Sequence, residues 1–337
     1  MVCAISMVRW EVLDNKGKNN WDNILYSHHD GNYFQADAWS MNKTQSGWKT
    51  FRFIAYGENK QIVGCAQFQV RYFPFSSCIA WCQGGPIGDK SVINNNMLNL
   101  CVKEFGCSHL YIRISPMRDY SKDYNKHLIN HGWIMPKYRM TSGLSMILDL
   151  DKDEDILFSK LSKNWRRNLK RFKEDGLTVE LWENPNINEI INLYSRMVSY
   201  KKIKEQYSKE NLTNLFKYLG DNILTYRCVH NGNLIGIRSA ITYENKGWDL
   251  LAATDQIARK KYVSYKLFWL LLMKCKDQSV KSYDLSGIDP ISNNGVYNFK
   301  KGTGAVEIKY IGEWEWSTSH IMKLILNFVI KFKKQTY

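Results

Sequence analysis

Two stretches of the chain, about half its length apart, carry the same pattern of strands and turns. Residues 51–73 read FRFIAYGENKQIVGCAQFQVRYF, two β-rich runs around the turn GENK, and residues 223–243 read ILTYRCVHNGNLIGIRSAITY, two runs around HNGN. In both stretches the second run opens with two apolar residues and a glycine, Gly64 in one and Gly236 in the other. A repeated hairpin at this spacing in a chain of 337 residues predicts an internal duplication.

The segments around the two hairpins also correspond. A third strand (CIAWCQ, then WDLLAAT), a helix (91–105, then 264–276) and a further strand (HLYIRIS, then KSYDLSG) follow each hairpin, and helical sequence precedes it, at 21–41 and 188–219. Helix, hairpin, strand, helix and strand is similar to the element order of GNAT-type acyltransferases. We therefore expect an α/β (α+β) protein of two tandem GNAT-like domains.

A strongly basic segment separates the two halves. DKDEDILFSKLSKNWRRNLKRFKEDG begins with acidic residues and ends at Gly176, a pattern that predicts a helix with apolar residues on one face and positive charge on the other. The expected organisation is a first, acceptor-side domain at 1–155, a basic linking helix at 156–176, and a second domain at 177–337.

Composition narrows the classes of function. The 47 basic and 32 acidic residues give a net charge of +15, which favours phosphate-bearing partners such as RNA, nucleotide-linked sugars or an anionic membrane surface. The eight cysteines include no C-x-x-C pair, so we expect neither a metal site nor a disulfide framework. No signal-peptide pattern and no apolar run near the ~20 residues of a membrane span is present, which predicts a cytoplasmic protein.

A set of motifs resembles the Fem-type aminoacyl-tRNA-dependent peptidyltransferases, the FemABX-like family. In order, between residues 33 and 312, these motifs are YFQADAWSMNK, GWKTFRFIAYG, WCQGGPIGD, YIRISP, LSKNWRRNLKRFKEDGL, KSYDLSG and VYNFKKGTG. Members of that family have two tandem GNAT-like domains and transfer an amino acid from charged tRNA to an amine of a peptidoglycan precursor. The short stretch at 188–219 is similar to members without an inserted helical arm.

The resemblance implies an aminoacyltransferase that uses aminoacyl-tRNA as donor, a UDP- or lipid-linked peptidoglycan precursor as acceptor, and no bound cofactor. Two alternatives stay open: an acyl-CoA-dependent N-acyltransferase acting on a nucleotide-linked sugar or surface polysaccharide, and a non-catalytic RNA-binding protein. CoA-binding GNAT domains hold the pyrophosphate at a glycine-rich helix start. Here ARKKYVSYKLF places Tyr262 and Ser264 at that start, which disfavours CoA.

Aminolysis of an ester needs positive charge where the intermediate's oxygen becomes negative. In NFKKGTG, Lys300 matches the family's functional lysine, and Gly302 and Gly304 are expected to shape a tight loop around it. The family's strand-end I-R-x-D-P carries an aspartate, whereas YIRISP carries Ser115, which cannot act as a base. Asp284, in YDLSG, is the expected replacement.

The remaining site predictions concern phosphate-bearing substrates. Basic groups at the domain junction are expected to hold the acceptor's diphosphate, and the basic helix and the Lys300 loop are expected to contact the donor tRNA. The acceptor-side residues are Lys43, Lys201, Lys202 and Trp248, and the donor-side residues are Lys301, Lys170, Arg171 and Arg166.

The C-terminal segment HIMKLILNFVIKFKK predicts an amphipathic helix in a protein that we expect to be a monomer. A basic amphipathic helix is typical of peripheral contact with an anionic inner membrane surface, and packing on the protein body is the alternative. The apolar face consists of Ile321, Leu324, Ile325, Phe328 and Phe332, and the opposite face of Lys323, Asn327, Lys331 and Lys334.

Overall fold

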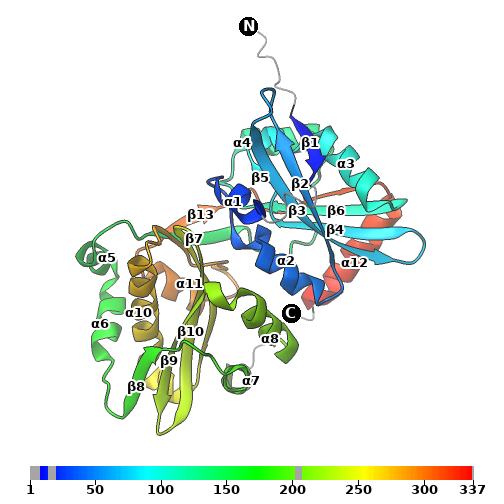
Figure 1. The fold of residues 1–337 in the computed structure, drawn as a ribbon. Coiled ribbons are helices and arrows are strands. Elements are labelled where there is room, and N and C mark those ends of the chain that lie inside the picture. The colour runs from blue at the N-terminus through cyan, green and yellow to red at the C-terminus, as the bar shows by residue number, and fades with distance from the viewer. Residues whose placement is uncertain (1–7, 14–19, 202–206, 336–337) are drawn as a thin grey trace. The chain divides into compact units, whose positions relative to one another are not determined.

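The computed structural model describes residues 8–13, 20–201 and 207–335. The chain divides into two compact units, each built on its own sheet with helices packed against it (Figure 1). Unit 1 comprises the chain up to Gly143 together with the segment from Lys309 onward, and unit 2 comprises Leu144–Ile308. None of the helices described is both long and apolar enough to cross a membrane.

Unit 1 contains a sheet of order β1-β2-β3-β4-β6-β14, in which β4 and β6 are parallel and the other neighbours antiparallel. A short strand, β5, pairs with β3. The strands are β1 (Arg9–Val12), β2 (Lys49–Tyr56), β3 (Ile62–Phe73), β4 (Ser77–Gly84), β5 (Ile87–Gly88), β6 (His109–Pro116) and β14 (Trp314–Ser317). The helices are α1 (Trp21–Tyr26), α2 (Asp37–Thr44), α3 (Asn95–Phe105), α4 (Lys122–Asn130) and α12 (His320–Gln335).

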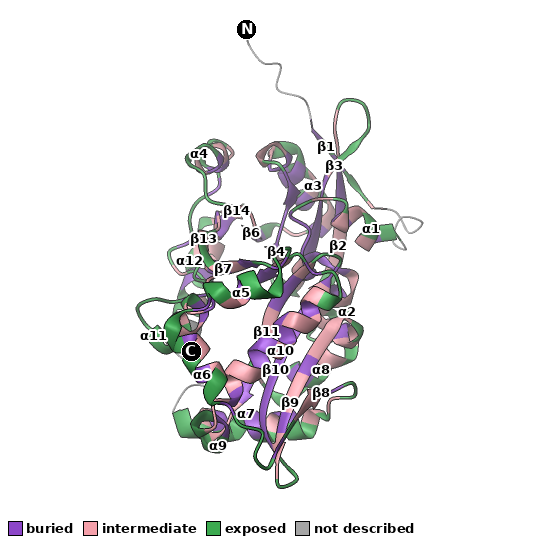
Figure 2. Ribbon diagram, turned by 90° about the vertical axis from the view of Figure 1, so that its left-hand side faces the viewer, coloured by how far each residue is buried: buried purple, intermediate pink, exposed green. Residues whose placement is uncertain are grey.

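The core of unit 1 forms where α3 packs on the sheet. Met97, Cys101 and Phe105 recur at helical spacing and are all buried. The ring of Phe105 lies 5.9 Å from that of Phe53 and 5.6 Å from that of Phe68, centroid to centroid. Figure 2 shows the sheet strands largely buried and much of the helices' outward-facing surface exposed. Period-two strands and a period-3.6 helix therefore bury their apolar faces against each other.

Unit 2 contains a sheet of order β13-β7-β12-β11-β10-β9-β8, in which β11 and β12 are parallel. The strands are β7 (Leu144–Asp149), β8 (Leu177–Leu181), β9 (Ile223–His230), β10 (Asn233–Tyr243), β11 (Lys246–Thr254), β12 (Ser282–Asp284) and β13 (Val306–Lys309). The helices are α5 (Glu154–Lys160), α6 (Lys163–Arg171), α7 (Ile187–Lys201), α8 (Lys209–Leu219), α9 (Gln256–Lys260), α10 (Val263–Asp277) and α11 (Asn294–Lys301).

Two sets of helices pack on the sheet of unit 2. Helix α10 packs on β9 and β10 through an apolar stripe that includes Leu267, Phe268 and Leu271. Helix α7 packs on β10 and β11, and against α8, so the 188–219 segment covers the sheet and forms no projecting arm in its described part. Both sets keep the parallel strands β11 and β12 covered.

The duplication predicted from the two hairpins is confirmed. The order β1-β2-β3-β4-β6-β14 of unit 1 corresponds to β8-β9-β10-β11-β12-β7 of unit 2. Gly64 on β3 pairs with Ala55, Gly236 on β10 pairs with Cys228, and a register shift adjoins each glycine. The two glycines therefore occupy matching positions in the two sheets.

The domain limits differ from those expected, because each sheet receives its sixth strand from the other half of the chain. Strand β7, expected in the domain at 1–155, pairs with β12, and β14, expected in the domain at 177–337, pairs with β6 and brings α12 into unit 1. Pairings between residues more than 130 positions apart leave no local pattern in the sequence, so the hairpin repeat could not reveal them.

Two smaller expectations are also corrected. The linking helix at 156–176 is instead two helices of unit 2, α5 and α6. The backbone leaves the helical conformation at Leu161, and the Ser162 hydroxyl accepts a hydrogen bond from the Trp165 N–H and caps the second helix. Cys78 and Cys107 form a disulfide, which the absence of C-x-x-C pairs did not predict. The pairing of Ser77 with His109 brings the start of β4 next to the segment before β6.

Candidate functional site

A cluster of charged side chains lies almost buried at the end of β12 in unit 2. Asp284 is the last residue of that strand, and in parallel register it faces Trp248 of β11, which is also buried. Lys300 reaches the cluster from the last turn of α11, and Arg238 and Asp249 reach it from β10 and β11. The structure therefore brings the two expected catalytic residues, Lys300 and Asp284, together.

The Lys300 ammonium is held by backbone carbonyls. Its Nζ donates hydrogen bonds to the carbonyl oxygens of Ser286 (3.2 Å) and Gly287 (2.9 Å), and the residue is only 7% exposed. Burial lowers the pKa of Lys300, and the carboxylates of Asp249 and Asp284 oppose this shift without cancelling it. An ammonium has three N–H donors, so these two contacts leave one donor direction for a substrate oxygen.

Asp284 organises the turn that receives Lys300. Its Oδ1 accepts hydrogen bonds from the Ser286 N–H (2.7 Å) and from the Ser145 hydroxyl of β7. Ser286 has a φ of 62°, a left-handed conformation that a non-glycine residue adopts at a cost unless its surroundings hold it there. Asp284 thereby fixes the turn whose carbonyl oxygens point at Lys300.

Arg238 and Asp249 form a buried ion pair that the sequence analysis missed. Arg238 Nε and an Nη of the same guanidinium donate to the two carboxylate oxygens of Asp249 at 3.0 and 2.7 Å, a two-point contact. The guanidinium also lies 4.6 Å from the ring centroid of Phe268 and 5.2 Å from that of Phe299, the residue before Lys300. A charged residue inside each of two otherwise apolar strands, IGIRSAI and WDLLAAT, was the available signal.

NFKKGTG is the end of a helix and not the loop that was expected. A Cβ atom on Gly302 would lie 2.7 Å from Trp165 Cδ1, and one on Gly304, whose φ is +81°, would lie 2.7 Å from the Lys160 carbonyl oxygen. The Trp165 indole N–H donates to the carbonyl oxygen of Phe299 at 3.0 Å. The glycines therefore allow the helix that carries Lys300 to pack closely against α5 and α6.

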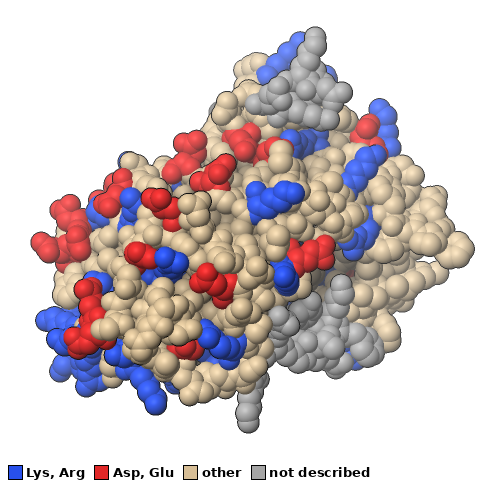
Figure 3. Space-filling model, turned by 60° about the horizontal axis from the view of Figure 1, so that its bottom comes forward, with Lys and Arg blue, Asp and Glu red and all other residues tan. Residues whose placement is uncertain are grey.

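The expected donor-side residues lie on the exposed part of this assembly. Lys170, Arg171 and Lys301 are exposed, and Arg166 donates to the Ser159 carbonyl oxygen (2.7 Å). Figure 3 shows Lys and Arg side chains gathered at the left of the molecule, the side on which α6 lies in Figure 1. Arg171 also donates to the Tyr262 hydroxyl (3.1 Å), so the basic helix adjoins the start of α10.

The expected acceptor-side residues belong to different units. Lys43 belongs to α2 of unit 1, where its Nζ lies 4.5 Å from the Trp39 ring centroid and burial, with a contribution from Arg71, lowers its pKa. Lys201 is the exposed last residue of α7, and Lys202 lies outside the described residues. Within unit 2, the buried Trp248 lies beside Asp284.

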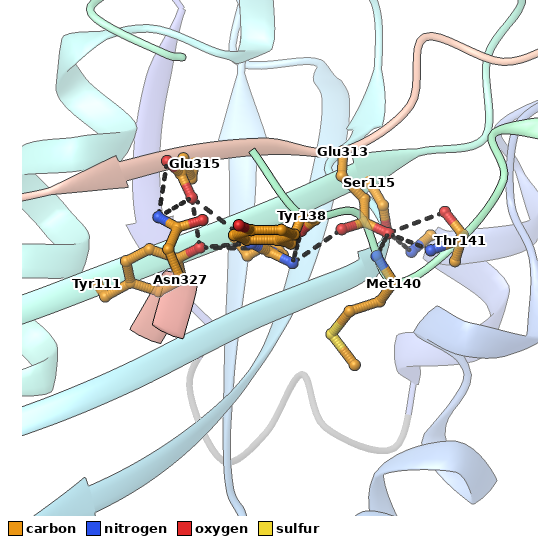
Figure 4. A network of polar contacts seen from close by, with 10 residues as sticks. Tyr111, Ser115, Tyr138, Met140, Thr141, Glu313, Glu315 and Asn327 are labelled. Carbon is orange, nitrogen blue, oxygen red and sulfur yellow. Dashed lines mark hydrogen bonds and ion pairs between the residues drawn. The ribbon is translucent and has the colours of Figure 1, made fainter. Parts of the chain in front are cut away.

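Unit 1 holds a second buried ionic network, between β6 and β14 (Figure 4). Arg113 donates to Glu313 (3.0 Å), to Glu315 (3.5 Å) and to the Tyr111 hydroxyl (2.7 Å), and Tyr111 in turn donates to Glu315. Glu313 also accepts hydrogen bonds from two backbone N–H groups, those of residues 140 and 141. Ser115, at the end of the same strand, accepts a hydrogen bond from the Gly84 N–H at 3.1 Å.

Comparisons with known proteins agree with this architecture. Residues 240–331, which include Trp248, Asp284 and Lys300, match the FemAB family. The crystal structure of FemX superposes with a TM-score of 0.82 at 14% sequence identity, over 95% of this chain and 100% of that chain. A tandem GNAT protein from the clavulanic acid biosynthesis pathway (TM-score 0.58, 9% identity, 93% of this chain and 99% of that chain) and L-PGS from Bacillus licheniformis (0.54, 14%, 93% and 96%) are also similar. No curated protein matches the chain by sequence.

The structural likenesses establish the class of fold, two tandem GNAT-like domains, and so confirm the fold expected from the repeat. The FemAB match covers residues 240–331, and the chain as a whole is similar in fold to FemX. These findings support a transferase, and broadly an aminoacyltransferase.

Proposed function

We propose that this protein moves an amino acid from aminoacyl-tRNA to an amine of a cell-envelope precursor of the peptidoglycan type. The observation that carries this proposal is the nearly buried Lys300 ammonium, held only by two carbonyl oxygens in its described hydrogen bonds. It lies in the part of the chain that matches the FemAB family. A desolvated cation with a donor to spare suits a reaction in which an oxygen atom becomes negatively charged.

The reaction is an ester aminolysis. The neutral acceptor amine attacks the ester carbonyl carbon, a C–N bond forms, and the carbonyl oxygen becomes an oxyanion that Lys300 stabilises. The C–O bond to the tRNA ribose then breaks, and the amine's proton ends on the released ribose hydroxyl. Asp284 holds the Ser286 turn and with it the position of Lys300.

The basic helix α6 supports a tRNA donor. It presents Lys170 and Arg171 on its exposed face, and Arg171 contacts Tyr262 directly before α10. Tyr262, the residue before α10, has a φ of 60°, a conformation in which glycine is common. Because a tyrosine stands there, the helix start lacks the small residues at which a CoA pyrophosphate approaches the backbone. Several exposed cations suit the repeated phosphates of an RNA chain better than a single pyrophosphate.

The acceptor is proposed to be UDP- or lipid-linked. Lys43 in unit 1 and Lys201 in unit 2 are each a proposed contact for the phosphates of such an acceptor. A lysine supplies positive charge but not the two-point hydrogen bonding of an arginine. It is therefore compatible with acceptors whose phosphate groups have different surroundings.

The direct test offers both donors to the purified protein. We would incubate it with a mixture of charged tRNAs or with acetyl-CoA, each with UDP-linked muramyl peptides and nucleotide sugars, and measure acceptor mass. We expect a mass increase by one aminoacyl residue with tRNA, lost in Lys300→Met and retained in Lys217→Met, whose lysine is exposed on α8. Transfer from acetyl-CoA without transfer from tRNA would contradict the proposal.

The tRNA contact has its own test. Reversing Lys170 and Arg171 together to Glu should weaken tRNA binding and flatten its dependence on salt. The matched control reverses Lys209 and Lys217, two exposed lysines of α8 in the same unit. Equal effects in the two double variants would show that α6 contributes only general positive charge.

A further inference from the structure

Helix α12 packs on unit 1 through a polar face, whereas an amphipathic helix usually packs through its apolar face. Asn327 is buried and its amide donates to the Glu315 carboxylate (3.4 Å), and Lys323 forms an ion pair with Glu315 at 3.5 Å. Leu326 is buried beside them. The face that carries Lys323 and Asn327 is therefore the face that packs on the sheet.

The apolar face of α12 consequently points away from its own unit's core. Ile321 is 70% exposed, and Leu324, Ile325 and Phe328 each have more than half of their surface exposed. Apolar side chains in water raise the free energy of a protein, so a contiguous stripe of them marks a surface that something else covers.

A second exposed apolar group lies at the turn between β3 and β4. Phe75 is 91% exposed, and Tyr72 and Phe73, at the end of β3, are also exposed. Aromatic side chains of this kind are enriched where a protein meets the interface of a bilayer.

Hydrogen bonds place these two groups at one edge of unit 1. Ser76, next to Phe75, accepts hydrogen bonds from the N–H groups of His109 (3.0 Å) and Ser108 (3.1 Å). The Ser108 carbonyl oxygen accepts one from the Thr318 hydroxyl (3.1 Å), two residues before α12 begins. Figure 1 shows α12 on the same side of unit 1 as the β3–β4 hairpin.

The charges of the two elements are all of one sign. Helix α12 contains four lysines and no acidic residue, and the hairpin Ile62–Gly84 contains Arg71 as its one charged residue. The exposed apolar residues of the two elements suit the acyl region of a membrane, and the net positive charge of the two elements suits negatively charged headgroups.

We propose that this apolar edge, formed by the outward residues of α12 and the β3–β4 turn, docks on an anionic phospholipid bilayer. The helix lies flat on the membrane through Ile321, Leu324 and Ile325, and Phe75 inserts beside it. Association places unit 1 at the surface where a lipid-linked substrate resides, yet the binding itself requires neither donor nor acceptor.

The test measures flotation of the full chain with vesicles of phosphatidylcholine alone or with about one third phosphatidylglycerol. We expect binding to the anionic vesicles that salt weakens, and a loss of at least roughly tenfold in Leu324→Ser/Ile325→Ser and in Phe75→Ser. Ile291→Ser is the matched control, because Ile291 is 90% exposed and belongs to unit 2. Circular dichroism would verify that each variant is folded.

Three results would overturn the proposal: no binding to anionic vesicles, binding that the α12 and Phe75 variants leave unchanged, or an equal loss in Ile291→Ser. Sedimentation velocity adds a fourth. A dimer of the wild-type chain that Leu324→Ser/Ile325→Ser dissociates, without vesicle binding, would assign the edge to a second copy. Because the vesicles contain no precursor, failure here leaves the proposed aminoacyl transfer untouched, and the converse also holds.

Discussion

The two units share one strand order but bury charge in different ways. In unit 1, Arg113 of β6 lies between Glu313 and Glu315. In unit 2, the ammonium of Lys300 is hydrogen-bonded to the neutral carbonyl oxygens of Ser286 and Gly287. The same architecture therefore holds two kinds of buried cation. In unit 1, carboxylates neutralise the guanidinium, whereas in unit 2 the described hydrogen bonds of Lys300 include no carboxylate.

We propose that this difference separates a structural site from a reactive one. Arg113 and its carboxylates join β6 to β14, the strand that arrives from the other half of the chain, so the network fastens the exchanged strand. Lys300 contributes no comparable fastening, and desolvation disfavours its charge. Groups with perturbed pKa values cluster at functional sites, which supports the role proposed for Lys300.

The largest expected effect comes from removing the buried guanidinium of unit 1. Arg113→Met should destabilise unit 1 by about 3–5 kcal/mol, because it leaves the buried carboxylates of Glu313 and Glu315 without their guanidinium. Hydrogen exchange of the β6 and β14 amides measures this. Arg227→Met, which removes the half-exposed pair with Glu180, is the control and should cost about 1 kcal/mol or less. Equal effects would mean that the network does not fasten β14.

The second prediction concerns the reactive side. Lys300→Met should lower kcat for aminoacyl transfer by about 10²–10³ with little change in the acceptor KM, since the charge acts on the oxyanion. The variant should keep its stability, because it removes a desolvated cation. Steady-state kinetics and thermal unfolding check both points, with Lys217→Met, an exposed lysine of the same unit, as the control. Full activity in Lys300→Met would remove Lys300 from the site.

The third prediction uses the pKa of Lys300, which burial lowers below the ordinary value of 10.5. Since the protonated form is the active one, kcat should fall as pH rises through this lowered pKa. Stability should change in the opposite sense. Between the two pKa values the unfolded chain binds more protons than the folded one, so stability rises with pH.

The difference between wild type and Lys300→Met isolates this effect, because all other groups titrate in both proteins. The unfolding free energy of the wild type should rise relative to that of the variant as the pH rises towards 10.5. Lys43→Met, whose lysine also has a lowered pKa, should leave the alkaline fall in kcat unchanged. A difference that is flat with pH would show that Lys300 titrates as an ordinary lysine.

Much of the fold could be predicted from the sequence because strands and hairpins are local patterns. The positions of Gly64 and Gly236 revealed the duplication, and both glycines occupy matching places in the sheets. The exchanged strands could not be predicted, since Glu315 pairs with Arg113 some 200 residues away. Nor could the break between α5 and α6, where one hydrogen bond to Ser162 Oγ decides the cap.

The site could be predicted only in part. Lys300 and Asp284 were identified through motifs, and the structure places both at the Ser286 turn. The helix around Lys300 was missed because Gly302 and Gly304 suggest a loop, whereas their lack of side chains serves the packing of α5 and α6. The orientation of α12 was also missed, because the pattern defines two faces but not which of them meets Glu315.

The smallest expected effect concerns Ser115, near the end of β6 in unit 1, and tests whether that strand end contributes to catalysis. Ser115 accepts a hydrogen bond from the Gly84 N–H, so Ser115→Ala leaves that donor without this partner and should cost about 0.5–1.5 kcal/mol of stability. It removes no charge and no base, so kcat should stay within about twofold, an effect far below that of Lys300→Met. Ser115→Asp should give no gain in rate, because the new carboxylate would meet the same backbone N–H. A loss of kcat in folded Ser115→Ala as large as that in Lys300→Met would place catalysis in unit 1 and reverse the comparison.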